Sequence, residues 1–131
     1  IGSDQGLDLN GKLVNKAKNF DEAHEQLKSM SGKEHTLITT TVVAKENNII
    51  WKYVDRGKMK MRMIDEEIIN EYLESIDEKI LGLVGVYAIE EEGIKLFERV
   101  GSDLFSIQGI SMIPLTQFLW DNGMLFENNG H

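Results

Sequence analysis

Apolar and polar residues alternate in several stretches of the chain, as expected for strands that bury one face. The alternation on either side of Asn10 and Gly11 predicts a β-hairpin over residues 5–15, because both turn residues tolerate positive φ. Residues 35–44 are rich in threonine and valine and predict a strand. A polar turn follows, and residues 49–54 predict a strand that returns beside it.

The middle and the end of the chain carry further strand-like patterns. A break is expected at residues 56–57, and residues 58–63 then alternate strictly between cations and methionines. This alternation predicts a half-buried strand whose methionines face the core. Residues 81–89 predict a loop that runs into a strand, and residues 94–100 and 104–108 predict another hairpin.

Apolar residues recur at helical spacing in three other segments. Asn19 predicts the N-cap of a first helix, with a glutamate three residues later completing a capping box and Gly32 closing the helix. Asp65 predicts the cap of a second helix, and Pro114 suits the first turn of a final helix that ends near Gly123. Together the elements predict an α/β (α+β) fold in which helices flank a mixed, strongly curved β-sheet.

The length of 131 residues suffices for one domain with its own core. We expect that domain to span residues 1–126, followed by a polar tail over residues 127–131. The absence of cysteine excludes disulfides, thiolate metal ligands and a cysteine nucleophile. The sequence contains no apolar run of membrane-spanning length and no leader pattern, so we expect a cytoplasmic protein that does not contact a membrane.

The net charge of −8 argues against DNA or RNA as a partner, because nonspecific binding to nucleic acid needs a basic face. A small phosphate ligand needs only a local cluster of donors, often with a divalent cation, so nucleotides stay open as ligands. The sequence contains no Walker-type loop, no GxGxxG loop and no zinc-ligand spacing. Composition and periodicity therefore indicate an α/β domain but do not identify its ligand.

Three residues are candidates for chemistry. Asp4 lies beside the predicted hairpin, where a carboxylate suits Mg²⁺ coordination or the orientation of a water; the alternative is a turn-forming aspartate. Lys16 is expected on the neighbouring strand at the same end, where it would clamp a phosphate; the alternative is a surface ion pair or a solvated lysine. Glu90 would converge on Asp4 to complete a metal site, or would simply belong to an acidic surface turn.

Five segments, taken in order, resemble motifs of the Maf family of nucleoside triphosphate pyrophosphatases. Residues 2–5 are similar to G-A-D-[TQ], residues 15–17 fall at the family's G-K-P, and residues 30–35 resemble L-S-G-x-x-H. Residues 84–90 resemble A-G-A-Y-x-[IL]-[QE], and residues 96–115 resemble F-x-E-x-x-x-G-D followed by G-[LI]-P-L. The resemblance covers nearly the whole chain and rests on the ordered set of motifs.

The resemblance implies roles for single residues. Asp4 would be a catalytic metal ligand or water-orienting base, Lys16 would be catalytic and bind phosphate, and Glu90 would assist the metal or the nucleophile. Lys16 lacks the usual flanking glycine and proline, and Glu91 replaces a glycine of the family pattern. The implied substrate-binding residues are Lys16, Ser31, Gly32 and His35. For Ser31 and Gly32, a helix end that leads into a strand is the structural alternative.

The resemblance also implies a reaction, in which a modified or non-canonical nucleotide is hydrolysed to nucleoside monophosphate and pyrophosphate with Mg²⁺ as cofactor. It further implies an inosine-triphosphatase-like fold, a homodimer, a proposed link to septum formation and a relation to the alphaproteobacterial branch.

The family's first strand and its S-x-S-x-R-R phosphate loop have no counterpart in the sequence, which therefore resembles an N-terminally truncated member. That loop supplies bidentate phosphate contacts that a lysine does not replace. The alternative function is therefore an inactive module that dimerises and at most binds nucleotide weakly. A protein-interaction domain unrelated to nucleotides would require the ordered motif match to be accidental.

Overall fold

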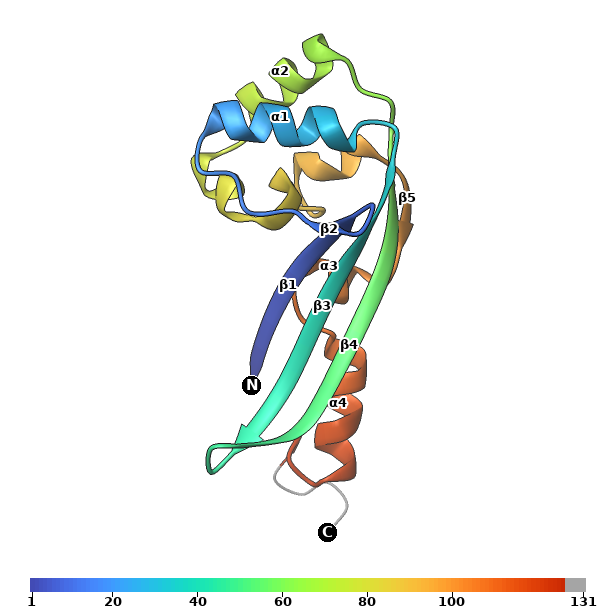
Figure 1. The fold of residues 1–131 in the computed structure, drawn as a ribbon. Coiled ribbons are helices and arrows are strands. Elements are labelled where there is room, and N and C mark those ends of the chain that lie inside the picture. Colours follow the sequence, from blue (N-terminus) through green and yellow to red (C-terminus); the bar gives the residue numbers. More distant parts are fainter. Residues whose placement is uncertain (127–131) are drawn as a thin grey trace.

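The computed structural model of the chain describes residues 1–126 (Figure 1). Its strands are β1 (Gly2–Leu9), β2 (Lys12–Leu13), β3 (Glu34–Lys45), β4 (Asn48–Met61) and β5 (Phe97–Gly101). Its α-helices are α1 (Phe20–Met30), α2 (Glu66–Ser75), α3 (Leu104–Gln108) and α4 (Met112–Asp121). The 3₁₀ helices η1 (Glu78–Gly82), η2 (Val84–Val86) and η3 (Glu92–Leu96) lie between α2 and β5. The predicted tail over residues 127–131 lies outside the described residues.

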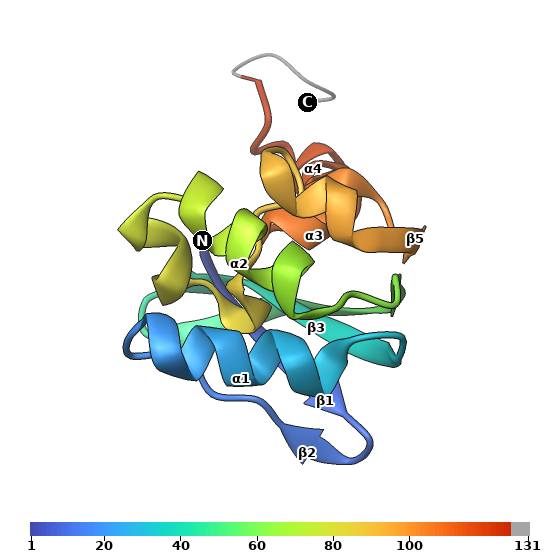
Figure 2. The same ribbon diagram turned by 90° about the horizontal axis from the view of Figure 1, so that it is seen from above.

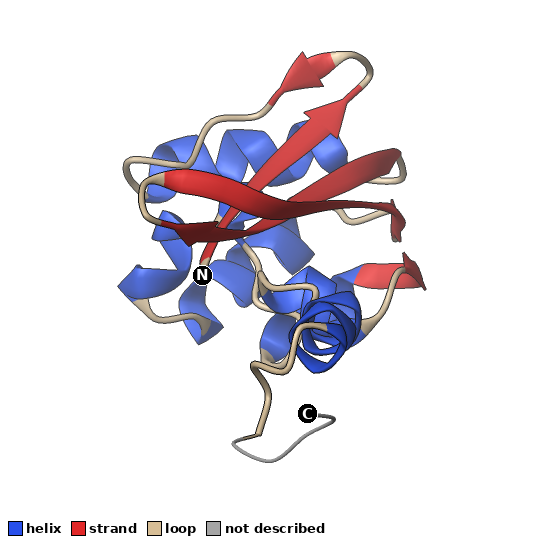
Figure 3. Cartoon of the chain, turned by 90° about the horizontal axis from the view of Figure 1, so that it is seen from below, coloured by secondary structure: helices blue, strands red, loops and turns tan. Residues whose placement is uncertain are grey.

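The strands form one curved sheet in the order β2-β1-β3-β4-β5 (Figure 3). The α/β class and the curved sheet with flanking helices are confirmed. Each strand pair within residues 1–126 is antiparallel, so the parallel pairs that a mixed sheet would contain do not occur there. One reason is the tight turn at Glu46 and Asn47, both with positive φ, which returns β4 directly beside β3.

The helices occupy two regions along the long strands. α1 and α2 lie side by side across one end of the sheet, and α4 follows the opposite end of β4 (Figure 1). Seen from above, α3 and α4 lie apart from α1 (Figure 2). Within the described part of the chain, the helices are too short or too polar to cross a membrane.

The apolar core lies between one face of the sheet and the layer that contains α1, α2 and the 3₁₀ helices. β3 buries alternate residues along most of its length, as expected for a strand with one covered face. Leu7, Leu37 and Met59 from that face pack in one cluster with Leu27 and Met30 of α1. This cluster holds β1 in place, and β1 carries the first of the predicted site residues.

The hairpin predicted at the start of the chain is confirmed at its turn, and its second strand is shorter than expected. Asn10 and Gly11 have φ values of 54° and 84°, as the tight turn requires. β2 contains two residues, and one more hydrogen bond runs from the N–H of Val14 to the carbonyl of Leu7. Residues 2–6 of β1 therefore have a paired strand on one side only, as far as the described chain extends.

The break predicted at residues 56–57 is wrong, because β4 runs through both residues without interruption. Gly57 is buried in the strand, and a Cβ at that position would lie 2.8 Å from the Cβ of Ser102. The glycine therefore permits two segments to pack closely and does not mark a turn. The two strands predicted on either side of the break are one strand.

The methionine pattern is confirmed for two of its three positions. Met59 and Met61 are fully buried on the covered face of β4. Met63 is 80% exposed, so its predicted place in the core is wrong. The strand ends at Met61, so the rule that alternate strand residues face the core no longer applies at Met63.

The three predicted α-helices are confirmed. The Asn19 side chain accepts a hydrogen bond from the N–H of Glu22 at 2.9 Å, and the Asp65 carboxylate accepts one from the N–H of Ile68 at 2.9 Å. These N-caps satisfy donors that an uncapped helix would leave unpaired. Pro114 lies in the first turn of α4, where its missing N–H costs no hydrogen bond.

Residues 104–108 form helix α3, so the strand predicted there is wrong. The Asp103 side chain accepts a hydrogen bond from the N–H of Ser106 at 3.0 Å, and Gly109 closes the helix with φ 127°. This local capping outweighs the strand-like composition of the segment. Within the other predicted strand, residues 94–100, only the second half is extended and belongs to β5.

Residues 81–89 contain no strand, which corrects the prediction of a loop running into one. The segment forms the end of η1, then η2, and then a turn. Gly85 and Val86 have φ values of 80° and 60°, which interrupt any extended run. The segment is consequently a compact irregular layer against the sheet.

Candidate functional site

A cavity of about 200 Å³ brings Asp4 and Lys16 together beside the side of β1 that has no paired strand. Asp4 lies in β1, opposite Thr40 of β3, and Lys16 lies on the segment from β2 to α1. The remaining walls come from Ser3, Gln5, Gly109 and residues 82–84. A carboxylate and an ammonium thus line one cavity, but the prediction that Lys16 lies on the neighbouring strand is wrong, because β2 ends at Leu13.

A second, smaller cavity of about 70 Å³ adjoins the first and contains Glu90 on its wall. Both cavities are lined by Gln5, Leu83 and Val84, so we treat them together and call them the cleft. Tyr87 also lines the smaller part. The three residues predicted to be catalytic therefore lie along one cleft, with Glu90 in a different part from the other two.

The charges of Asp4 and Lys16 are available to a ligand. Both side chains are exposed, and among residues 1–126 no ion pair joins them. Oδ1 of Asp4 accepts a hydrogen bond from the N–H of Gln5 at 3.0 Å, which orients the carboxylate and leaves its other oxygen unused. A phosphate chain with its divalent cation matches this pair, because the ammonium attracts the phosphates and the carboxylate attracts the cation.

The donor set of the cleft fits Mg²⁺ that binds together with a phosphate ligand. Residues 1–126 contain no group of three or more histidine and carboxylate side chains that could hold a metal by themselves. Mg²⁺ commonly takes one or two protein carboxylates and completes its shell with water and substrate oxygens. Asp4 and Glu90 are two such carboxylates on the cleft.

A strained residue, Val86, lies two positions after Val84, which lines both parts of the cleft. Val86 is β-branched and has φ 60°, a conformation that costs on the order of 1–3 kcal/mol. The hydroxyl of Tyr72 donates a hydrogen bond to the carbonyl of Val86 at 2.6 Å, and Val86 itself is fully buried. Packing and this hydrogen bond therefore hold the segment in shape where Val84 meets the cleft.

Ser31 and Gly32 lie at the end of α1, and neither lines the cleft within the described chain. The Ser31 hydroxyl donates to the carbonyl of Ile64 at 2.9 Å and accepts from its N–H at 2.7 Å. Gly32 has φ 68°, and a Cβ there would lie 3.1 Å from the sulfur of Met63. These contacts give both residues a structural role at the helix end, and substrate binding by them stays a prediction.

His35 is buried in β3 and reaches the cleft only through Tyr87. Its Nε2 lies 2.9 Å from the Tyr87 hydroxyl, and both rings contact Phe97. Burial lowers the pKa of His35 from 6.5 to about 4, so the imidazole is neutral near pH 7. Burial also raises the pKa of Tyr87. The hydrogen bond therefore joins two neutral side chains and holds the Tyr87 ring at the cleft.

Acidification is expected to destabilise the protein through His35. Its folded pKa of about 4 lies below the ordinary value of 6.5, so the unfolded state binds the proton more readily between these values. The free energy of unfolding should therefore fall by up to about 3 kcal/mol as the pH drops from 6.5 to 4. Urea unfolding across this range measures the loss.

His35→Gln should remove this part of the pH dependence, because glutamine does not titrate. His24→Gln is the matched control, since His24 lies on α1 with Nε2 3.2 Å from the exposed Glu66 carboxylate and outside the core. That control should keep the loss of stability between pH 6.5 and 4. The same pH dependence in His35→Gln and in the unaltered protein would contradict the assignment to His35.

Several residues that line the cleft have no role in the sequence-based prediction. Gln5, Leu83, Val84 and Tyr87 are the clearest cases. Gln5 alternates with Leu7 along β1 and so faces the covered side of the sheet, a signal that the sequence does contain. Leu83 lies between the 3₁₀ helices η1 and η2, and Val84 begins η2; no periodic pattern predicts which way such residues point.

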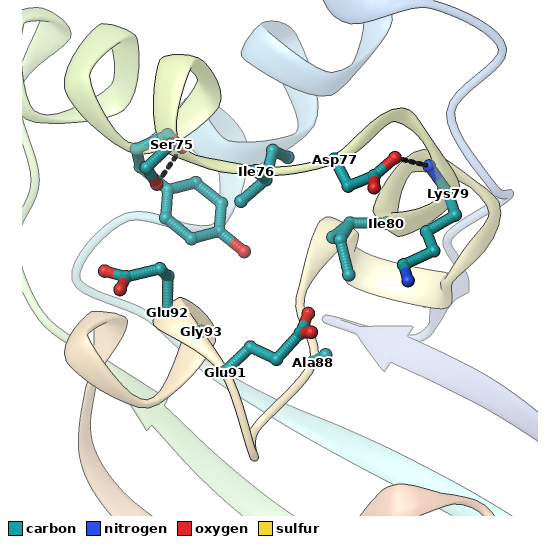
Figure 4. A pocket seen from close by; sticks show the side chains of 10 residues that line it. Ser75, Ile76, Asp77, Lys79, Ile80, Ala88, Glu91, Glu92 and Gly93 are labelled. Atoms are coloured by element: carbon teal, nitrogen blue, oxygen red, sulfur yellow. Dashed lines mark hydrogen bonds between the residues drawn. The ribbon is translucent and has the colours of Figure 1, made fainter.

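A separate cavity of about 310 Å³ shares only Ala88 with the cleft (Figure 4). Tyr72 and the carboxylates of Asp77, Glu91 and Glu92 border it. Glu91, which stands where the family pattern has a glycine, therefore lines this cavity and not the cleft. None of the residues predicted to bind substrate or metal lines it.

A family described as "Maf-like protein" matches residues 1–122. A 7-methyl-GTP pyrophosphatase of Rhizobium meliloti is 37% identical over 125 residues, which is 95% of this chain and 63% of that protein. A nucleoside triphosphate pyrophosphatase of Caulobacter vibrioides is 38% identical over 125 residues, with the same coverage of 95% and 63%. One from Granulibacter bethesdensis is 40% identical over 119 residues, 91% of this chain and 60% of that protein.

The chain spans less than two thirds of the length of these relatives. Their sources are alphaproteobacterial, which agrees with the branch that the resemblance implied. The family match extends over β1, the segment that carries Lys16, and the loop that carries Glu90. Ordered motifs, fold and relatives agree, and the chain belongs to the Maf-like protein family.

Proposed function

We propose that this chain hydrolyses a modified or non-canonical nucleoside triphosphate to the monophosphate and pyrophosphate. The observation that supports this most directly is the shared cavity of Asp4 and Lys16, with Glu90 further along the same cleft. Relatives that cover most of this chain are named nucleoside triphosphate pyrophosphatases or 7-methyl-GTP pyrophosphatases. Modified nucleotides are therefore the substrate class to test first.

In the proposed reaction, water attacks the α-phosphorus and the bond from that phosphorus to the oxygen bridging to the β-phosphate breaks. Lys16 binds oxygens of the phosphate chain through its ammonium group, which offsets their negative charge. Asp4 orients the attacking water and takes up its proton, and pyrophosphate leaves with the electron pair of the broken bond. Asp4 and Glu90 would also hold Mg²⁺, which supplies electrostatic stabilisation of the phosphate chain when bound.

The second candidate function is an inactive module that dimerises and binds nucleotide weakly. Two departures from the family pattern favour this candidate, because Lys16 lacks the flanking glycine and proline and Glu91 replaces a glycine. We propose a homodimer in either case, as the resemblance to the family implies, and the oligomeric state of the chain in solution tests it. A cytoplasmic location and a link to septum formation stay predictions.

Pyrophosphate release by the purified chain tests the proposal. The panel contains the common ribonucleoside and deoxyribonucleoside triphosphates together with 7-methyl-GTP, each with Mg²⁺ and with excess EDTA. We expect release from a subset of the panel that returns to background in EDTA, because Lys16 is the one cationic side chain on the described lining of the cleft and a triphosphate carries more negative charge than one lysine offsets. No release from a folded chain on any nucleotide would contradict the proposed activity and favour the inactive module.

A further inference from the structure

Lys16 lies in a segment of the chain that has no regular secondary structure. This segment connects β2, which ends at Leu13, with α1, whose N-cap is Asn19. It runs back alongside α1 to reach the start of that helix (Figures 1 and 2). Within the described chain, residues 15–18 make no hydrogen bond between backbone groups. The place of Lys16 therefore depends on contacts that come from elsewhere in the fold.

The residue after Lys16 is anchored by packing. Ala17 is buried and belongs to the same core cluster as Leu27 of α1. The family pattern has a proline at this position, and its ring would restrict φ, whereas alanine imposes no such restriction. Burial of a single methyl group therefore holds the chain after Lys16 in place but does not fix its backbone dihedrals.

The residue before Lys16 is anchored by a hydrogen bond. Nε2 of Gln26 donates to the carbonyl oxygen of Asn15 at 2.6 Å, and that carbonyl has no other hydrogen bond within residues 1–126. Gln26 lies on α1 directly before Leu27, which is fully buried, so the core holds the backbone at Gln26 firmly. The hydrogen bond thus ties the residue before Lys16 to a fixed part of α1.

The orientation of the Gln26 carboxamide shows which of its groups the fold uses. A backbone carbonyl can only accept a hydrogen bond, so the nitrogen must face Asn15. Oε1 is then buried, and it has no hydrogen-bond donor within residues 1–126. A buried acceptor without a donor is unfavourable and uncommon in native proteins. The fold retains the carboxamide despite this cost, and the group that finds a partner is the donor to Asn15.

We propose that Gln26 is a positioning residue, which through its hydrogen bond to Asn15 holds the Lys16 ammonium in the cavity that Lys16 shares with Asp4. This inference rests on the proposed function of the cleft, in which Lys16 binds the phosphate chain. Gln26 itself does not line the cleft within the described chain, so it acts through Lys16. The hydrogen bond restricts the segment before the nucleotide arrives, so less conformational entropy is lost on binding.

Gln26→Met tests this role, because methionine has a similar length and lacks the donor. KM for the best nucleotide of the panel should rise by roughly 3- to 10-fold, the size of one neutral hydrogen bond. The value of kcat should change by less than about 2-fold, because the lost restraint weakens ground-state and transition-state binding equally. The free energy of unfolding should stay nearly the same, since methionine also removes the buried unpaired oxygen of Gln26 and the exposed Asn15 can bind water instead.

Two further variants accompany this test. Gln26→Ala also lacks the donor and favours a helix, so it should raise KM to a similar extent even if methionine does not fit. Gln117→Met is the matched control, because Gln117 is exposed on α4 and its Nε2 donates to Oδ1 of Asp121 on the same helix at 2.8 Å. The control should change KM by less than about 2-fold. Equal changes of KM in Gln26→Met and Gln117→Met would overturn the role of Gln26.

A double-mutant cycle with Lys16 separates positioning from a general disturbance of the fold. Binding of a non-hydrolysable α,β-methylene analogue is measured by calorimetry in the unaltered chain, in Lys16→Ala, in Gln26→Met and in the double variant. If Gln26 acts through Lys16, adding Gln26→Met to Lys16→Ala should cause no further loss of affinity. A loss by the same factor in both backgrounds would show that Gln26 acts on the fold as a whole, and would overturn the proposal.

Limited trypsin digestion measures the hold on the segment without any nucleotide. Trypsin cleaves after lysine, and cleavage inside a folded chain requires the segment to open locally. Gln26→Met should speed cleavage after Lys16 by roughly 3- to 10-fold and leave cleavage after Lys45, at the end of β3, unchanged. Unchanged cleavage after Lys16 would overturn the role of Gln26 and leave the pyrophosphatase activity standing.

Digestion and nucleotide assays together distinguish failure of this inference from failure of the proposed function. Release by the unaltered chain, with an unchanged KM in both Gln26 variants, would overturn the role of Gln26 alone. Faster cleavage after Lys16 in Gln26→Met, together with no release and no binding in the unaltered chain, would overturn the proposed function and with it the role of Gln26 in phosphate binding.

Discussion

Asp4→Asn is expected to lower pyrophosphate release by about 100-fold or more, the effect of removing a positioned acid–base group. Asparagine has nearly the same shape and keeps an acceptor for the N–H of Gln5, which Asp4 now binds at 3.0 Å. It loses the negative charge that would attract Mg²⁺ and the basicity that would take the proton of the attacking water. Initial rates at saturating Mg²⁺ and nucleotide measure the loss.

Asp8→Asn is the matched control for this experiment. Asp8 lies on the same strand and on the same face as Asp4, four positions further on, and it does not line the cleft. Its Oδ1 accepts a hydrogen bond from the N–H of Gly11 at 2.8 Å, which asparagine also accepts. The control removes one negative charge from β1 and should change the rate less than about 2-fold. Equal losses in the two variants would show that Asp4 acts only through the overall charge.

Gly85→Ala is expected to lower the free energy of unfolding by about 2–4 kcal/mol, the sum of a backbone cost and a packing cost. Gly85 has φ 80°, which disfavours any side chain. A Cβ there would also lie 2.7 Å from a methyl carbon of Leu7 and 2.7 Å from the ring of Tyr87. Both neighbours are buried, so neither can move aside without disturbing the core. Urea unfolding measures the loss.

Gly11→Ala separates the two costs. Gly11 has nearly the same φ, 84°, but a Cβ there would have no atom within 4 Å. It should therefore cost only the backbone part, about 1 kcal/mol. Equal losses in the two variants would contradict a packing role for Gly85. Because Tyr87 and the neighbouring Val84 line the cleft, Gly85→Ala should also weaken nucleotide binding, whereas Gly11→Ala should not.

Caps and tight turns depend on residues that are close in sequence, and the sequence predicted these features correctly. The caps at Asn19 and Asp65 and the turn at Asn10 each need only a few neighbouring residues, and each occurs in the structure as expected. The errors arise where contacts distant in sequence decide. Residue type alone predicts a turn at Gly57. In the structure its small size instead allows close packing against Ser102, which is too distant in sequence for a local pattern to reveal.

In the cleft, too, the contacts between residues distant in sequence were the ones that the sequence did not predict. The ordered motifs indicated Asp4, Lys16 and Glu90 as candidates. The sequence placed Lys16 on a strand beside Asp4, whereas in the structure β2 ends at Leu13 and the segment that follows it carries Lys16 to the cavity. The positions of Ser31 and His35 relative to the cleft could not be derived from the sequence either. Ser31 is held by Ile64 and His35 by Tyr87, and both partners are far away in the chain.

The sequence by itself determined the α/β class, the family and the residues most suited to phosphate chemistry, because periodicity, caps and ordered motifs are properties of neighbouring residues. Only the tertiary structure decided how those residues face a ligand. It joined the two parts of the cleft at Gln5, whose amide nitrogen is held by Thr39 and by two carbonyls of α3. Such an arrangement depends on three segments meeting in space, and hydrogen-bond geometry of that kind has no signature along a single chain.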